Sequence, residues 1–150
     1  MAAQRSGLIE HGADAAAQDK RGLTPLHQAF WRGHVDVAQL LIEHGADAPA
    51  KDKHGSTPLH RASLRGGVDL ARLLIEHSVD AAAKNEHGWT PLHQASAWGD
   101  VDLALLLIEH GDVAAQDEHR STPLHCASSR GDVDQARLLI ERGADVATQW

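Results

Sequence analysis

Apolar and polar residues follow helical spacing in two short stretches between residues 52 and 84. The first begins with Thr57-Pro58, a helix N-cap residue followed by proline at the first helical position, and ends at Gly66-Gly67, where glycine permits a sharp reversal. The second carries an apolar stripe at i, i+3, i+6 and i+7, made by Val68, Ala71, Leu74 and Ile75. The pattern predicts a helix of about two turns, a tight turn and a second, amphipathic helix.

The same two-helix pattern occurs four times along the chain. Thr-Pro-Leu-His begins at residues 24, 57, 90 and 122, so the spacings are 33, 33 and 32 residues. Each copy is followed by a Leu-Leu-Ile-Glu block, which begins at residues 40, 73, 106 and 138. Between copies, stretches such as residues 82–88 lack the helical pattern and are predicted to form extended turns. Because one unit cannot bury its stripe alone, the period predicts units that stack in a line around a shared aliphatic core.

On these residues the chain resembles the ankyrin-repeat family, whose units have this period and this signature. The resemblance covers about residues 8–149. It implies an all-α solenoid of stacked helix-turn-helix units with β-hairpin or extended finger loops between them. It also implies one domain, 1–150, made of a partial repeat at 1–18 and repeats at 19–51, 52–84, 85–116 and 117–149. The amino-acid sequences of the repeats are similar to those of long fungal-type arrays.

The resemblance further implies a non-catalytic protein–protein interaction module, which binds a partner through a concave surface of inner helices and fingers. Residues that vary within the regular repeats are the candidates for partner contact, and Trp and Arg dominate measured interface hot spots. The candidates are Leu23, Trp31, Arg32, Leu64, Arg65, Trp89, Trp98 and Arg130. The alternative is that the tryptophans cover the ends of short inner helices. If they form an interface, alanine at Trp31, Trp89 and Trp98 should leave helicity and melting nearly unchanged.

Composition and charge narrow the choice of function. The net charge is −7, with +1 in residues 1–75 and −8 in residues 76–150, and no continuous basic stripe exists to neutralise phosphates, so nucleic acid is not expected as a partner. No apolar run is long enough for a membrane span, and residues 1–6 lack a signal-peptide core, which with a single cysteine predicts a cytoplasmic or otherwise intracellular protein. Motifs for phosphate loops, nucleophile elbows and zinc proteases are missing, so neither an enzyme nor a bound cofactor is expected.

The twelve histidines fall mainly into three columns. One lies in the Thr-Pro-Leu-His blocks, at His27, His60, His93 and His125; the others lie near the ends of the second helices and at the finger tips. Stacked helix pairs are about 10 Å apart, whereas zinc ligands converge within about 4 Å, so no column forms a metal site by itself. The first column is interpreted as hydrogen-bonding residues that tie Thr to the backbone of the next repeat.

Two alternative functions stay open at this point. One is an engineered or consensus-like ankyrin scaffold without a natural ligand, against which the irregular residues Pro49, Ser78 and Arg120 argue. The other is a histidine-based element that responds to metal or pH.

Departures from the regular repeat carry further predictions. Ser78 and Arg120 occupy positions where the other units have glycine, so both are predicted to adopt left-handed backbone at a cost of about 1 kcal/mol each. The glycines at the helix-end position are Gly45, Gly111 and Gly143. One residue is missing after Gly111, which predicts a displaced or mobile fourth finger. Gln135 is interpreted as part of a polar outer face, and the unfinished end repeats predict weak end-to-end self-association.

Overall fold

The chain forms a line of helix pairs. A computed structural model describes residues 14, 17–64, 67–98 and 100–144. The helices within this part of the chain are α2 (Pro25–Arg32), α3 (Val35–Glu43), α4 (Pro58–Leu64), α5 (Val68–Glu76), α6 (Pro91–Trp98), α7 (Val101–His110), α8 (Pro123–Arg130) and α9 (Val133–Glu141). No strand occurs among these residues. The all-α solenoid predicted from the sequence is confirmed, whereas the predicted partial repeat at 1–18 lies largely outside the described residues.

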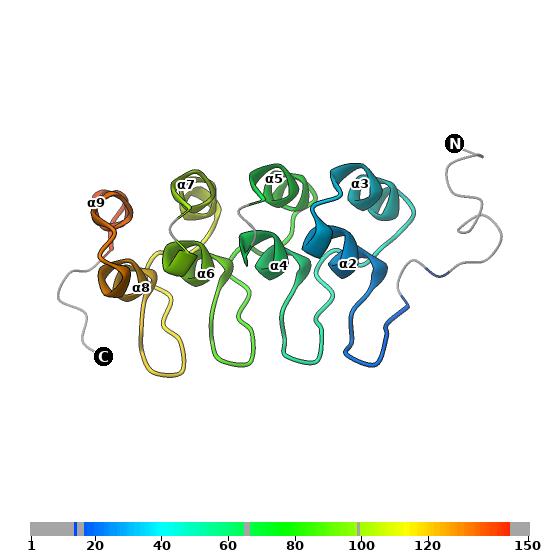
Figure 1. Ribbon diagram of the computed structural model, residues 1–150, viewed down its shortest axis with the longest axis horizontal. Helices are drawn as coiled ribbons and strands as arrows, with labels where there is room; N and C mark the ends of the chain where they lie inside the picture. The colour runs from blue at the N-terminus through cyan, green and yellow to red at the C-terminus, as the bar shows by residue number, and fades with distance from the viewer. Residues whose placement is uncertain (1–13, 15–16, 65–66, 99, 145–150) are drawn as a thin grey trace.

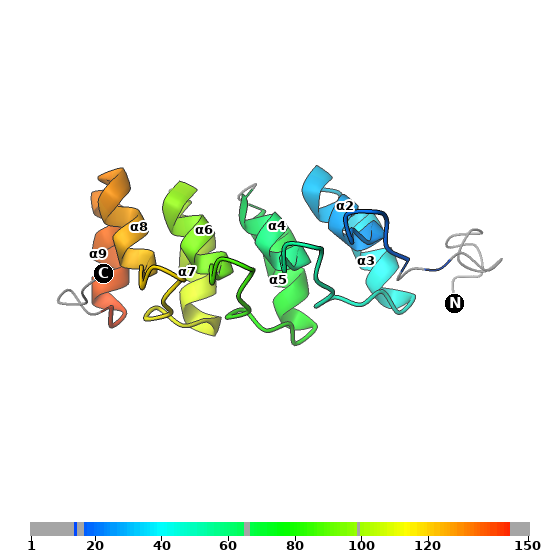
Figure 2. The ribbon, with the colours of Figure 1, turned by 90° about the horizontal axis from the view of Figure 1, so that it is seen from below.

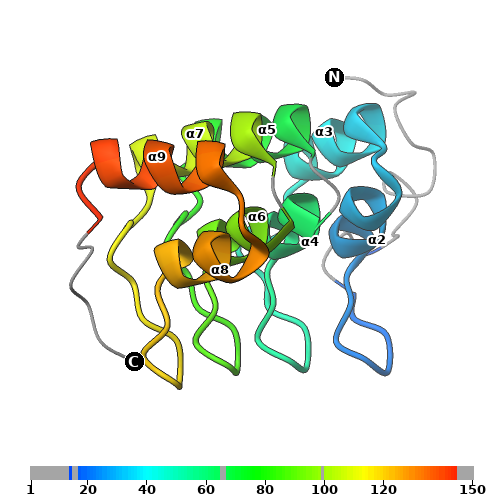
Figure 3. The same cartoon turned by 60° about the vertical axis from the view of Figure 1, so that its left-hand side comes forward.

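The helices lie in two rows. Figure 1 shows α2, α4, α6 and α8 in an inner row, and α3, α5, α7 and α9 in an outer row. The pairs follow one another in chain order along one line (Figure 2), and each inner helix packs on the next. The fingers, residues 18–23, 51–56, 84–89 and 116–121, project from the inner row on the side away from the outer row (Figure 3).

Small and aliphatic side chains fill the space between the rows. Leu59, Leu74 and Leu107 are fully buried, and Phe30 is the largest fully buried side chain among the described residues. Alanines recur at buried positions of both rows, and these are Ala29, Ala62, Ala95, Ala127, Ala38, Ala71 and Ala104. A single cluster of buried apolar residues extends along the array. Each repeat therefore depends on its neighbours for its core.

The inner helices begin at the predicted threonines. Thr24 and Thr122 are N-caps in extended conformation, and proline follows each of them at the start of the helix. The Thr24 hydroxyl accepts the His27 N–H, and the His27 ring in turn accepts the Thr24 N–H, which completes a capping box with histidine in place of the usual Glu or Gln.

Ser78 and Arg120 have left-handed backbone, as predicted, with φ of 65° at both positions. Gly111 occupies the position equivalent to Ser78, and the expectation for this position is wrong in its case: its φ is −119° and its ψ is −157°. The missing residue explains the difference, because α7 continues through His110 and Gly111 leaves the helix extended. The deletion is absorbed there, so the fourth finger keeps the regular hydrogen bonds and the predicted displacement is also wrong.

Gln135 was interpreted as a polar outer-face residue, and the structure corrects this because its side chain is 0% exposed. It occupies the position of Leu70 and Leu103 in the preceding units, where a buried leucine fills the space between the helices. Both polar atoms of its amide are buried without a hydrogen-bond partner. Burial of this kind costs free energy, since water no longer solvates the amide.

Gln135→Leu is therefore expected to raise the free energy of unfolding by about 1–3 kcal/mol, because leucine has no polar atoms to desolvate. Urea unfolding followed by tryptophan fluorescence measures the change. Gln39→Leu is the control, because Gln39 is exposed on α3. If Gln135→Leu raised the free energy of unfolding no more than Gln39→Leu does, the buried amide would not be the cause of the lost stability.

Candidate partner-binding surface

The inner helices and the fingers together form one continuous face, which we call the inner surface. Each finger is closed by an Asp or Asn side chain at its second position. In the second finger, Asp52 Oδ1 accepts the N–H groups of His54 and Ser56, at 2.8 and 3.0 Å. The same arrangement recurs at Asp19, Asn85 and Asp117. These side chains fix the shape of every finger, because each satisfies two backbone donors at once.

Successive fingers are joined through their main chains. The Lys53 N–H donates to the Arg21 carbonyl at 3.0 Å, the Glu86 N–H to the His54 carbonyl at 2.9 Å, and the Glu118 N–H to the His87 carbonyl at 3.0 Å. These bonds hold the fingers in register along the array.

Buried histidines connect each repeat to the next. His27, His60 and His93 donate from Nε2 to the carbonyls of Ser56, Trp89 and Ser121, at 3.1, 2.8 and 2.8 Å. Their Nδ1 atoms accept the N–H of the preceding N-cap threonine, at 3.1 Å in each case. An N–H can only donate and a carbonyl can only accept, so these rings are neutral with the proton on Nε2. The structural role predicted for the first histidine column is confirmed at these positions.

Burial lowers the pKa of His27, His60 and His93, and the carbonyl of the next repeat opposes this only in part. The folded chain therefore binds fewer protons than the unfolded chain just below pH 6.5, the ordinary histidine value. We expect the free energy of unfolding to be at its full value above pH 6.5 and to fall as the pH drops below it. The midpoint of urea unfolding at pH 7.5, 6.5 and 5.5, measured at low protein concentration, tests this expectation. A midpoint that stays level or rises below pH 6.5 would contradict the expectation.

Trp89 is the last residue of the third finger and contacts the fourth finger. Its indole N–H donates to Asp117 Oδ2 at 3.0 Å, and its ring stacks on His93 with the centroids 5.8 Å apart. It lines a groove of about 470 Å³ that Asp117, Ser121 and Arg130 also line, and a second space of about 410 Å³ between the third and fourth fingers. Burial opposes ionisation of Asp117, but the N–H groups of Ser121, His119 and Trp89 outweigh it and lower the pKa of that carboxyl.

The other predicted contact residues differ in exposure. Trp31 and Trp98 are 40% and 61% exposed at the ends of α2 and α6, and Arg32 is exposed beside Trp31. Arg130 is half exposed, and its guanidinium donates to the Ala97 carbonyl at 3.4 Å. The remaining three candidates are Leu64, which is half-buried, Leu23, which is 8% exposed, and Arg65, which lies outside the described residues.

Sequence reasoning missed Arg61 and Asp52. The Arg61 guanidinium donates to Asp52 Oδ2 at 2.9 Å and lies over the Trp31 ring, 5.0 Å from its centroid. Burial opposes ionisation of Asp52, but Arg61 and the N–H groups of Ser56 and His54 outweigh it and lower the pKa. Two signals could have found them. An Asp or Asn recurs five residues before each Thr-Pro-Leu-His, and the residue after each of these histidines varies between units.

Burial raises the pKa of the Cys126 thiol to about 11, which keeps it protonated and unreactive. Within the described residues, no group of three or more His, Cys, Asp or Glu side chains is placed to hold a metal ion. The finger-tip histidines instead pair with glutamates in a chain that includes His54–Glu86 at 3.1 Å and His87–Glu118 at 3.4 Å.

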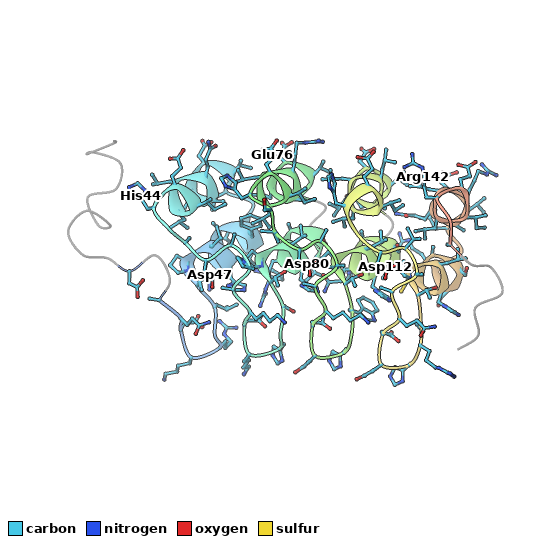
Figure 4. The ribbon with its side chains drawn as sticks, turned by 180° about the vertical axis from the view of Figure 1, so that it is seen from behind. His44, Asp47, Glu76, Asp80, Asp112 and Arg142 are labelled. Carbon is cyan, nitrogen blue, oxygen red and sulfur yellow. The ribbon has the colours of Figure 1, made fainter. Side chains whose placement is uncertain are left out.

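Acidic residues in the loops that follow the outer helices α3, α5 and α7 do not converge either. Figure 4 shows Asp47, Asp80 and Asp112 one beside the next in successive repeats. Asp80 and Asp112 each accept the N–H of the residue two positions later, at 2.9 Å in both cases. These carboxylates therefore close turns, and they repeat with the period of the array.

A comparison with protein-family models finds ankyrin repeats (3 copies) at residues 2–85, 49–117 and 78–149, which together span nearly the whole sequence. The chain belongs to the ankyrin-repeat family. Ankyrin repeats are generally protein–protein interaction modules, and the family is typically non-catalytic. No curated protein matches the chain. Of the helices described for this ankyrin-repeat chain, none is long and apolar enough to cross a membrane.

Proposed function

We propose that this ankyrin-repeat chain binds a protein partner through its inner surface. The observation that carries the proposal is the exposure of Trp31 and Trp98, at 40% and 61%, at the ends of two inner helices. Trp side chains in such positions supply much of the energy of measured interfaces. The fingers of the inner surface are fixed by their Asp and Asn side chains and by bonds to one another, so little ordering entropy opposes binding.

The structure changes the expectation for Trp89. Its ring is half-buried, stacks on His93 and donates to Asp117, so alanine at this position removes contacts that support the fold as well as any partner contact. A test of binding is cleaner at Trp31 and Trp98, whose side chains are the more exposed ones.

Selection of peptides from a random 16-residue display library on the whole chain provides the ligand for this test. The double variant Trp31→Ala, Trp98→Ala is expected to bind the selected peptides with an affinity lower by about tenfold or more. The matched control is Val37→Ala with Val133→Ala, because these side chains are 47% and 65% exposed on the outer helices α3 and α9. We expect both double variants to keep the helical signal of the parent chain. An equal loss of affinity in the control pair, or no selected peptide at all, would contradict the proposal.

A further inference from the structure

We propose that the inner surface of the first two repeats binds an acidic segment of the partner, with one carboxylate side chain seated among Arg21, Arg32 and Arg61 beside Trp31. This inference rests on the proposed function and adds the chemistry of the partner to it.

The first observation is the distribution of charge on the inner surface. Residues 18–32 and 51–64, which form the first two fingers with α2 and α4, carry six basic and two acidic side chains, a net charge of +4. The corresponding residues 84–98 and 116–130 carry three of each and are neutral overall. The whole chain has a net charge of −7. Positive charge is therefore concentrated on one part of the inner surface, although the net charge of the chain is negative. Charge complementarity favours a negatively charged ligand at this part.

The second observation is a pocket within this basic area. Arg21, Gln28, Trp31, Arg32 and Arg61 are among its lining residues, and its volume is about 210 Å³. Pockets that hold drug-sized molecules or cofactors measure roughly 300–1,000 Å³. The space suits a single side chain, and the guanidinium groups around it suit a carboxylate, which can accept two parallel hydrogen bonds from one arginine.

Arg61 is already held in place for such contact. Asp52, whose side chain is 1% exposed, accepts from one of its nitrogens, and the Trp31 ring supports its guanidinium from one face. Guanidinium has five N–H donors, so others stay available for a ligand. Arg21 and Arg32 make no side-chain ion pair within the part of the chain that the structure describes. Among the described residues, neither of them therefore has a carboxylate within ion-pair distance as Arg61 has, although the charge of Asp19 lies near enough to Arg21 to interact with it.

An acidic polypeptide fits these observations better than a nucleic acid. The basic area covers two repeats, or about 20 Å at the usual spacing of packed helices. Beyond it, Glu86, Asp117 and Glu118 lie on the fingers that a longer phosphate backbone would follow. A peptide can place carboxylates on the basic area and present other side chains to the neutral groove around Trp89.

The test uses the random-peptide selection on the whole chain and on two variants of equal charge. Arg21→Glu with Arg32→Glu reverses the charge of the pocket, whereas Arg72→Glu with Arg137→Glu makes the same change at exposed positions on the outer helices α5 and α9. We expect peptides selected on the parent chain to be enriched in Asp and Glu relative to the starting library. Their affinity should fall at least tenfold in the pocket variant and less than twofold in the outer-helix variant. A higher salt concentration should also lower the affinity of these peptides for the parent chain, because screening reduces the attraction between charges.

Other outcomes separate this inference from the proposed function. Peptides that lack acidic enrichment but still lose affinity with Trp31→Ala and Trp98→Ala would overturn the acidic segment and leave the proposed function intact. Failure to select any peptide would overturn both. A single-stranded oligonucleotide that binds the parent chain as tightly as the peptides, and loses affinity in the pocket variant, would assign the pocket to phosphate and overturn the inference.

Discussion

Replacing His60 with alanine is expected to lower the free energy of unfolding by roughly 3–5 kcal/mol, which places it among the most damaging single substitutions in the chain. The ring is 0% exposed and contacts two repeats at once. It accepts the Thr57 N–H at 3.1 Å and donates to the Trp89 carbonyl at 2.8 Å. Alanine leaves the Thr57 N–H and the Trp89 carbonyl without the hydrogen bonds that the ring makes, and it creates a cavity between the repeats.

Urea unfolding and thermal melting of His60→Ala measure the loss, and His119→Ala is the control. His119 is a finger-tip residue whose side chain is 77% exposed, so its truncation removes a histidine without opening the core. We expect the control to change the free energy of unfolding by less than about 0.5 kcal/mol. A His60→Ala loss no larger than that of the control would show that the histidine column does not join the repeats.

The sequence was sufficient for the repeat architecture because each element is specified four times. Thr-Pro at the start of each inner helix and an apolar stripe on each outer helix fix the local structure, and stacking follows because neither helix can bury its stripe alone. The left-handed backbone of Ser78 and Arg120 was predictable for the same reason, since glycine occupies nearly all equivalent positions.

Predictions failed where a single change had more than one structural solution. The missing residue after Gly111 could displace the finger or extend the helix, and only the structure shows that α7 takes it up. A polar residue at position 135 could lie outward as a cap or inward in the place of a leucine. The structure shows that Gln135 is buried although its amide atoms have no hydrogen-bond partner.

The candidate surface was only partly predictable, because contacts between repeats depend on side chains that are far apart in the sequence. Trp31 and Arg61 are thirty positions apart, yet the ring and the guanidinium lie against one another. Trp89 stood out as an irregular aromatic residue, but its bond to Asp117 in the next finger could not be read from either position alone. Composition identified the residue types, and the stacking geometry decided which of them meet.

Arg120 shows how the same geometry limits the choice of residue at the finger turn. A Cβ atom added at Gly88 would lie 2.9 Å from Asp117 Cα, and one added at Gly22 would lie 2.8 Å from the Lys53 nitrogen. In both cases the obstacle is the backbone of the next finger. Arg120 occupies the corresponding position in the fourth finger, and no finger follows it among residues 121–144. A side chain is therefore accommodated there, although its φ of 65° is still unfavourable.

Gly88→Ala is accordingly expected to lower the free energy of unfolding by about 3 kcal/mol or more, from backbone strain together with steric overlap. The backbone φ at Gly88 is +78°, and the new methyl group would meet three backbone atoms of Asp117 and Glu118 at 2.9–3.1 Å. Backbone atoms cannot rotate away as a side chain can. The fourth finger must shift, and the hydrogen bond from the Glu118 N–H to the His87 carbonyl must lengthen or break.

Gly131→Ala provides a matched control, because Gly131 has a φ of +77° and an added Cβ would meet nothing within 4 Å. This variant carries the same backbone strain without the overlap, so it should lose only about 1 kcal/mol. The difference between the two urea unfolding curves then measures the cost of pushing one finger off the next. Equal losses would mean that the fingers adjust freely to an extra methyl group and that their close stacking contributes little to the stability of the array.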